Sequence, residues 1–170
     1  WDILYTELFE EDKHEDATKK TVEEVVLGEN VKTIEDNAFS GCKNLKKVSM
    51  NGTVTEIGNK AFYKCTSLTS IEIPSKVNKI GKQAFYGCKS LKSIVIPQGV
   101  EEIDNKAFYF CESLKKVINN SNLDIQIGAE THGYVAYYAT KVINAPNAVI
   151  DGDFIWCNLN GANTLACYIG

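Results

Sequence analysis

The chain contains no arginine, so lysine supplies all 18 of its basic residues. Arginine is the side chain best suited to bidentate capture of a phosphate or carboxylate, and its absence excludes sites built on guanidinium clamps. With 22 acidic residues among 170, the net charge is −4. An acidic chain lacks the basic surface by which proteins usually bind nucleic acids, so we expect no nucleic-acid partner.

Several functional motifs are also missing. No run approaches the ~20 apolar residues that cross a bilayer, so no membrane insertion is expected. The N-terminus has no signal-peptide pattern and no initiator Met, which is typical of a mature or excised fragment. There are only two histidines, His14 and His132, and no hydrolase, metalloprotease or phosphate-loop motif. We therefore expect no enzymatic activity, no metal site and no cofactor.

What the chain does contain is a repeat of 23 residues. Six columns are identical in four copies, which composition alone does not explain. The columns are Val31, Val54, Val77, Val100; Ile34, Ile57, Ile80, Ile103; Ala38, Ala61, Ala84, Ala107; Phe39, Phe62, Phe85, Phe108; Cys42, Cys65, Cys88, Cys111; and Leu45, Leu68, Leu91, Leu114. Each Leu leads into an alternating apolar pair such as Val48 and Met50.

The repeat divides the chain into three parts. Residues 1–20 are expected to be an N-terminal cap or the remnant of a preceding unit, since Trp1, Leu4, Tyr5 and Leu8 form a helical stripe that can cover an open end. Residues 21–120 form the regular array. Residues 121–170 contain degenerate repeats and a C-terminal segment that we expect to be truncated.

One 23-residue unit buries too little surface to fold alone, so the copies must stack. The alternating residues after each Leu predict a short strand, and stacked strands pair in parallel at ~4.8 Å. Glu35, Gly58, Gly81 and Asp104 precede the Ala-Phe pairs and favour turns or helix starts. The prediction is an α/β solenoid with short parallel strands stacked on one face and turns with short helical or 3-10 segments on the other.

Residues 57–74 and 80–97 both carry the pattern Ile-Gly-x-x-Ala-Phe-x-x-Cys-x-x-Leu-x-x-Ile-x-Ile-Pro. This pattern resembles the BspA-type leucine-rich repeat over roughly residues 21–120. The resemblance implies a right-handed leucine-rich-repeat solenoid. It also implies an extracellular or cell-surface location and adhesion to a host or matrix protein.

The four cysteines of the repeat lie 23 residues apart, without the Cys-x-x-Cys or His spacing that zinc sites need. Parallel stacked side chains also lack the Cβ geometry of a disulfide. We therefore expect a buried, reduced column in which Cys acts as a small hydrophobic residue. Cys157 and Cys167 lie ten residues apart in an irregular segment, and whether they form a bridge is left open.

Two columns alternate away from the predicted core and should line the concave face of the sheet. They are the candidate binding residues. The first contains Glu24, Lys47, Ser70, Ser93 and Lys116, and the second contains Val26, Ser49, Glu72, Val95 and Ile118. Lys46, Lys92 and Lys115 add a basic edge that can attract an acidic ligand such as a sialylated or sulfated glycan. The alternative is that these lysines protect sheet edges and keep the protein soluble.

Tyr63, Tyr86 and Tyr109 form a further column, for which mutual packing is favoured over binding of sugar rings. The leading functional hypothesis is a binding module that contacts a host or matrix protein, or a glycan, through its concave face. The alternative is a structural spacer that projects a neighbouring domain, since aromatic anchors are missing from that face. An intracellular scaffold would suit the unpaired thiols but not the family resemblance.

Overall fold

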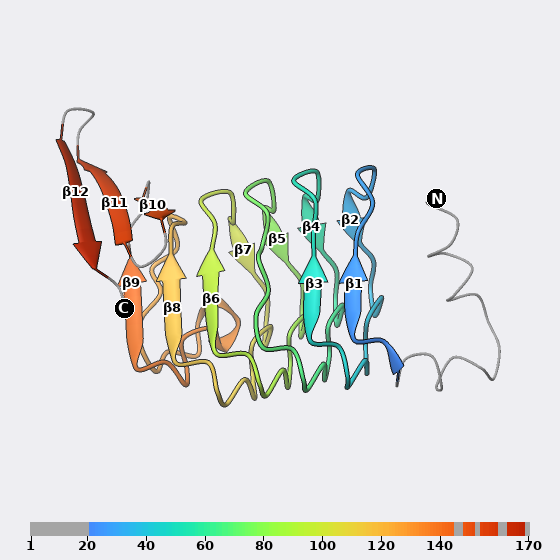
Figure 1. The fold of residues 1–170 in the computed structure, drawn as a ribbon. Helices are drawn as coiled ribbons and strands as arrows, with labels where there is room; N and C mark the ends of the chain where they lie inside the picture. The colour runs from blue at the N-terminus through green and yellow to red at the C-terminus, as the bar shows by residue number, and fades with distance from the viewer. Residues whose placement is uncertain (1–20, 145–147, 152–153, 160–162, 169–170) are drawn as a thin grey trace.

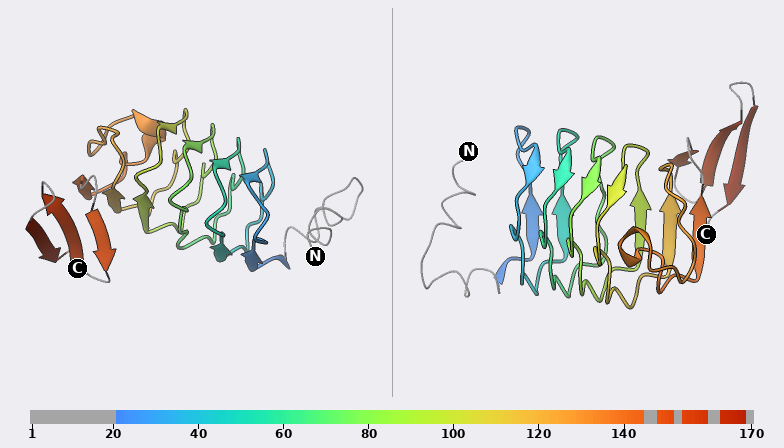
Figure 2. Two further views of the ribbon diagram at one scale, coloured as in Figure 1. Left: turned by 90° about the horizontal axis from the view of Figure 1, so that it is seen from above. Right: turned by 180° about the vertical axis from the view of Figure 1, so that it is seen from behind.

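The computed structural model describes residues 21–144, 148–151, 154–159 and 163–168, with side chains over residues 21–144. The predicted cap at residues 1–20 and its apolar stripe lie outside the described residues. Over residues 21–144 the chain winds into a parallel-strand solenoid, with one strand row on each of two opposite sides (Figures 1 and 2).

The longer strands form the row at the front of Figure 1. They are β1 (Glu24–Val26), β3 (Lys47–Ser49), β6 (Ser93–Ile96), β8 (Lys116–Asn119) and β9 (Lys141–Asn144). β1 pairs with β3, β6 pairs with β8, and β8 pairs with β9, all in parallel. The register equals the sequence repeat, since Glu24 lies beside Lys47 and Ser93 beside Lys116. Residues 69–73, between the two groups, form no strand, so this sheet is in two parts.

A second parallel sheet lies on the other side of the solenoid. Its strands are the two-residue elements β2 (Thr33–Ile34), β4 (Glu56–Ile57), β5 (Lys79–Ile80) and β7 (Glu102–Ile103). Each ends on the invariant Ile, which is buried, and starts on an exposed or half-buried polar residue. The alternation of strand side chains therefore explains why only the second position of each pair is apolar.

The helical part of the fold prediction is not confirmed. Within residues 22–144 the one helical segment is the 3-10 segment η1 (His132–Tyr134), and the stretch around each Ala-Phe pair consists of turns. The reason lies in two columns of left-handed residues, which a right-handed helix cannot include. Asn37, Lys60, Gln83 and Lys106 form one column, and Gly41, Lys64, Gly87 and Phe110 form the other.

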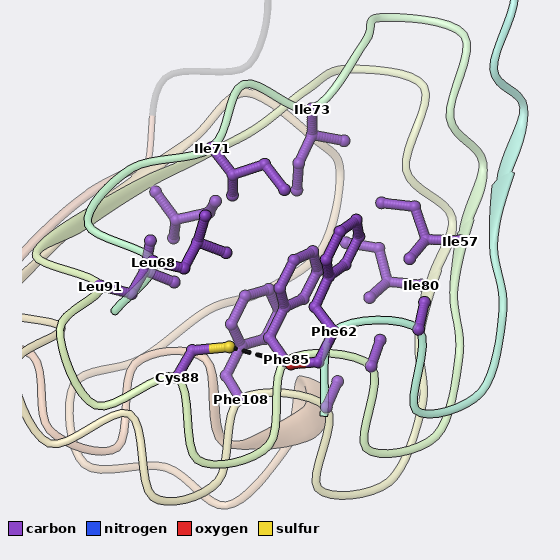
Figure 3. Close-up of a cluster of buried hydrophobic side chains, with 14 of the residues drawn as sticks. Ile57, Phe62, Leu68, Ile71, Ile73, Ile80, Phe85, Cys88, Leu91 and Phe108 are labelled. Atoms are coloured by element: carbon purple, nitrogen blue, oxygen red, sulfur yellow. Dashed lines mark hydrogen bonds between the residues drawn. The ribbon is translucent and has the colours of Figure 1, made fainter. Parts of the chain in front are cut away.

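The core runs along the solenoid axis as columns of identical side chains (Figure 3). Phe39, Phe62, Phe85 and Phe108 are at most 1% exposed, and their rings stack with centroids 5.0–5.2 Å apart. The backbone supports this stack, since the N–H of each Phe donates to a carbonyl one turn further along the chain, at 2.7 Å. Neighbouring repeats are therefore joined by both side-chain packing and backbone hydrogen bonds.

The stacking continues beyond residue 120. The N–H of Phe108 donates to the carbonyl of Gly133 in η1, and β9 pairs with β8. Gly133 has a φ of +64°, and a Cβ there would lie 2.6 Å from the carbonyl oxygen of Asp104. The segments β10 (Ala148–Asp151), β11 (Phe154–Leu159) and β12 (Asn163–Tyr168) then form an antiparallel sheet at the end of the array (Figure 1). The predicted three-part division of the chain stays a prediction.

Candidate binding surfaces

The first candidate column lies along the outer side of the longer strands, which we call the strand face. Glu24, Lys47 and Ser93 are exposed on β1, β3 and β6, and Lys116 is half-buried on β8. Ser70 is exposed too, but it lies in the segment that forms no strand. Lys47 Nζ lies 2.9 Å from Glu24 Oε1, so the register of β1 and β3 brings two candidate residues together as an ion pair.

The second candidate column is less uniform. Val26 is 69% exposed, Val95 is 36% exposed, Glu72 is exposed and Ser49 is half-buried. Ile118 is only 5% exposed, so the expectation that it lies on the accessible face is wrong. Its neighbours in the sheet are Val95 and Ile143, and apolar side chains on both sides favour its burial.

The basic edge consists of exposed lysines with differing partners. Lys46 Nζ lies 3.0 Å from Glu23 Oε2, and Lys115 Nζ donates to the carbonyl of Tyr138 at 3.3 Å. Lys92 is also exposed. Ion pairs between exposed side chains are weak, so a charged ligand can compete for these lysines at little cost in stability.

The cysteine column is buried, and its members Cys42, Cys65, Cys88 and Cys111 form no disulfide. The thiols of Cys65, Cys88 and Cys111 donate to the carbonyls of Phe39, Phe62 and Phe85 at 3.1–3.2 Å. Figure 3 shows the bond made by Cys88. The prediction of a purely hydrophobic column did not include these bonds. Burial raises the pKa of all three thiols, that of Cys111 to about 12. The side chains of Cys157 and Cys167 lie outside the described residues. The backbone register places them opposite Leu165 and Ile155, respectively.

The tyrosine column packs against itself, as favoured from the sequence. Tyr63 and Tyr86 stack at 5.0 Å, and Tyr86 meets Tyr109 edge-on at 6.0 Å. The column then continues into Phe110, Tyr134, Tyr137 and Tyr138. These residues form an aromatic strip along the turns, and lysines lie over three of its rings at 5.2–6.0 Å.

Sequence reasoning missed a hollow beside this strip. It has a volume of about 290 Å³ and lies over the turns that contain Cys65, Cys88 and Cys111. Phe110, 37% exposed, forms part of its wall. The signal was present, because Phe110 occupies a column that holds glycine in two other copies.

The described residues offer no candidate metal centre. Among them, no three His, Cys, Asp or Glu side chains converge in a way that can hold a metal ion. No helix in this part of the chain has the length and apolar composition needed to span a membrane. The polar side chains of interest therefore lie on the strand face, on the basic edge and around the hollow.

Comparison with known proteins identifies relatives of this architecture. The sequence profile of the BspA type leucine rich repeat region matches residues 17–132, in six copies. The crystal structure of the leucine-rich-repeat protein TpLRR of T. pallidum is similar at 31% identity and a TM-score of 0.63, over 72% of this chain and 56% of that one. A search of curated proteins finds no match.

Two further solved structures are similar over 72% of this chain. A leucine-rich-repeat protein from Bacteroides ovatus is 33% identical with a TM-score of 0.58, over 30% of its own length. A leucine-rich cell surface protein from Faecalibacterium prausnitzii is 31% identical with a TM-score of 0.60, over 32% of its own length. The chain thus spans less than two thirds of the length of these relatives.

Proposed function

Because the chain belongs to the family of BspA-type leucine-rich-repeat proteins, we propose that it is a non-enzymatic extracellular or cell-surface module that binds a host or matrix protein, or a glycan, through the strand face. The location is supported by the F. prausnitzii relative, which is described as a cell surface protein. The proposed adhesion is supported by the resemblance to BspA-type repeats.

The observation that carries the proposal is the contrast between the core and the strand face. Core positions hold the same residue in four copies, because stacking requires it. The first outer column instead changes from Glu24 to Lys47, Ser70, Ser93 and Lys116, with most of these side chains exposed. A solenoid tolerates many residues at such positions, so this surface can be specialised for a partner without loss of the fold.

A second candidate function is a structural spacer that projects a neighbouring domain. It is favoured by the chemistry of the strand face, which exposes Ser, Lys, Glu and Val but none of the aromatic or arginine anchors that dominate many interfaces. It is also compatible with relatives that are much longer than this chain.

The test is a binding screen of the purified chain against matrix glycoproteins and a glycan array. A triple variant, Lys47→Glu, Glu72→Lys and Lys116→Glu, alters both columns of the strand face. A matched variant, Lys32→Glu, Glu101→Lys and Lys76→Glu, makes the same charge changes at exposed positions outside those columns. We expect saturable binding that only the first variant loses.

Two results would contradict the proposal. Binding that survives in the strand-face variant would place the site elsewhere on the molecule. If neither proteins nor glycans bind with a Kd of ~10 µM or lower, the spacer becomes the better description.

A further inference from the structure

The hollow in the aromatic strip has the size of a site for a small group. Its volume of about 290 Å³ is close to the lower limit of ~300 Å³ for small-molecule pockets. Its lining includes Lys64, Thr66, Tyr86, Lys89, Phe110 and Glu112, which come from three successive turns. The hollow therefore suits one ring or one side chain and is too small for a folded surface.

Phe110 is the unusual residue of this hollow. Its φ is +60°, a conformation disfavoured for a bulky side chain, and glycine occupies the same column at positions 41 and 87. Although 37% exposed, its ring packs 4.3 Å from Tyr109 and edge-on to Tyr86 at 5.3 Å. All four copies have a positive φ at this position, so the exposed aromatic ring at the wall of the hollow, and not the backbone, sets Phe110 apart.

The charges around the hollow favour an anion. The lining contains two lysines, Lys64 and Lys89, and one carboxylate, that of Glu112. The carboxylate oxygen Oε1 of Glu112 lies 3.5 Å from Lys89 Nζ. Lys64 Nζ lies 5.2 Å from the centroid of the Tyr63 ring. One positive charge thus remains unmatched by a carboxylate within the lining, beside aromatic ring surface.

The backbone around the hollow disfavours an extended peptide as the ligand. The N–H groups of Lys64, Gly87 and Lys89 donate to the carbonyls of Tyr86, Tyr109 and Gly87 at 2.7, 2.8 and 2.8 Å. A peptide that adds a strand needs free main-chain groups at a sheet edge, and these donors are already used. Recognition must therefore come from ring faces, hydroxyls and charged side chains.

From these features we propose that the hollow binds a carboxylate-bearing sugar unit of a glycan, a uronic or sialic acid. The apolar C–H face of the sugar ring packs against Phe110 and Tyr86, and the carboxylate pairs with Lys64. Thr66 and Glu112 offer hydrogen-bonding groups to the sugar hydroxyls. This site lies over the turns and does not depend on binding at the strand face.

The test is an NMR titration of the ¹⁵N-labelled chain with 3′-sialyllactose and with a hyaluronan tetrasaccharide, using lactose as the neutral control. We expect a Kd of about 1 mM or lower for at least one acidic sugar, with shifts centred on residues 64–66, 86–89 and 110–112. Phe110→Gly should weaken binding about tenfold or more. This variant should still fold, since glycine adopts the required φ readily.

Two further variants examine the charge. Lys64→Gln should weaken binding of the acidic sugar, and the fold tolerates Gln in a left-handed conformation, as Gln83 shows with a φ of +57°. Lys76→Gln removes the same charge from an exposed turn outside the hollow and should leave the Kd unchanged.

Several results would overturn the proposal. They are no shifts with either acidic sugar, equal binding of lactose, and unchanged affinity in a folded Phe110→Gly variant. An acetylated tetraglutamate peptide that shifts the same residues when the sugars do not would assign the hollow to acidic peptides instead.

Discussion

At the scale of single residues, the cysteine thiols combine two roles. They fill a buried column, and three of them also donate a hydrogen bond to a Phe carbonyl of the preceding repeat. The donor proton is needed for that bond, and burial keeps it in place by raising the pKa of the thiols. The fold therefore depends on neutral thiols.

This dependence predicts a loss of stability at alkaline pH. In the unfolded chain the thiols lose their protons near the ordinary pKa of 9.0, whereas burial in the folded chain raises the pKa of all three, that of Cys111 to about 12. The folded state then binds more protons, so the free energy of unfolding should fall as the pH rises above about 9, by up to ~1.4 kcal/mol per pH unit for each thiol. Urea unfolding from about pH 8 to about pH 11 measures this slope.

Cys88→Ala provides the control for the alkaline effect. The variant loses some stability at every pH, but its slope above pH 9 should be smaller by the share of one thiol. An identical slope in the variant and the wild type would mean that lysines such as Lys79, whose pKa is raised by Glu102, account for the effect.

The ion pair between Lys47 and Glu24, unlike the buried thiols, is expected to contribute little to stability. Both side chains are more than half exposed, so water screens their attraction. Lys47→Ala should change the free energy of unfolding by less than ~1 kcal/mol, as judged by urea titration. A larger loss would show that this pair supports the sheet, and its variants would then be poor probes of binding.

At this scale the sequence predicted buried residues better than exposed ones. Identity in four copies is a strong signal of burial, because a stacked core leaves no freedom of size or shape. Alternation is a weaker signal, and it placed Ile118 on the accessible face although the structure buries it. Alternation assigns a side of the strand, whereas exposure depends on the neighbouring strands.

At the scale of elements, turns replace the helical segments that the sequence suggested. Lys60, Lys64 and Gln83 adopt left-handed conformations although none is glycine or asparagine. Their residue types therefore carried no signal of a turn, and the spacing alone allowed a short helix equally well. The predicted strands are present after Leu45, Leu91 and Leu114, since period-two alternation is specific to strands, but the stretch after Leu68 forms none.

A substitution in η1 can test whether the array extends beyond its regular copies. Gly133→Ala would place a methyl group against the Asp104 carbonyl and the Ala107 side chain, at a φ that alanine rarely adopts. We expect a loss of ~2 kcal/mol or more in the free energy of unfolding, measured by urea titration. Gly52→Ala is the matched control, because its Cβ meets nothing within 4 Å, and it should change stability by no more than ~0.5 kcal/mol.

A result in which the two glycine variants are equally stable would contradict the packing of η1 on β7 and the Phe108 turn. The array would then end with the fourth copy.

At the scale of the whole molecule, the protein is a linear stack in which each repeat packs mainly on its neighbours. Stability of such a stack comes from the contacts between repeats more than from any single unit. The surface can then vary along the stack, and it offers two separate candidate sites, the strand face and the hollow over the turns.

The architecture at this scale followed from the 23-residue period, because a fixed period with invariant apolar columns permits few arrangements other than a solenoid. The hollow did not follow from it. Its shape arises where side chains from three turns meet, and a one-dimensional pattern does not contain that information.

The most direct test of the stacked core is urea unfolding of Phe85→Ala. Phe85 is 0% exposed and lies between Phe62 and Phe108 at 5.2 and 5.0 Å. Its truncation should lower the free energy of unfolding by ~3–5 kcal/mol and uncouple the two halves of the stack, which a broadened transition would reveal. An unfolding midpoint equal to that of the wild type would contradict the stacked core.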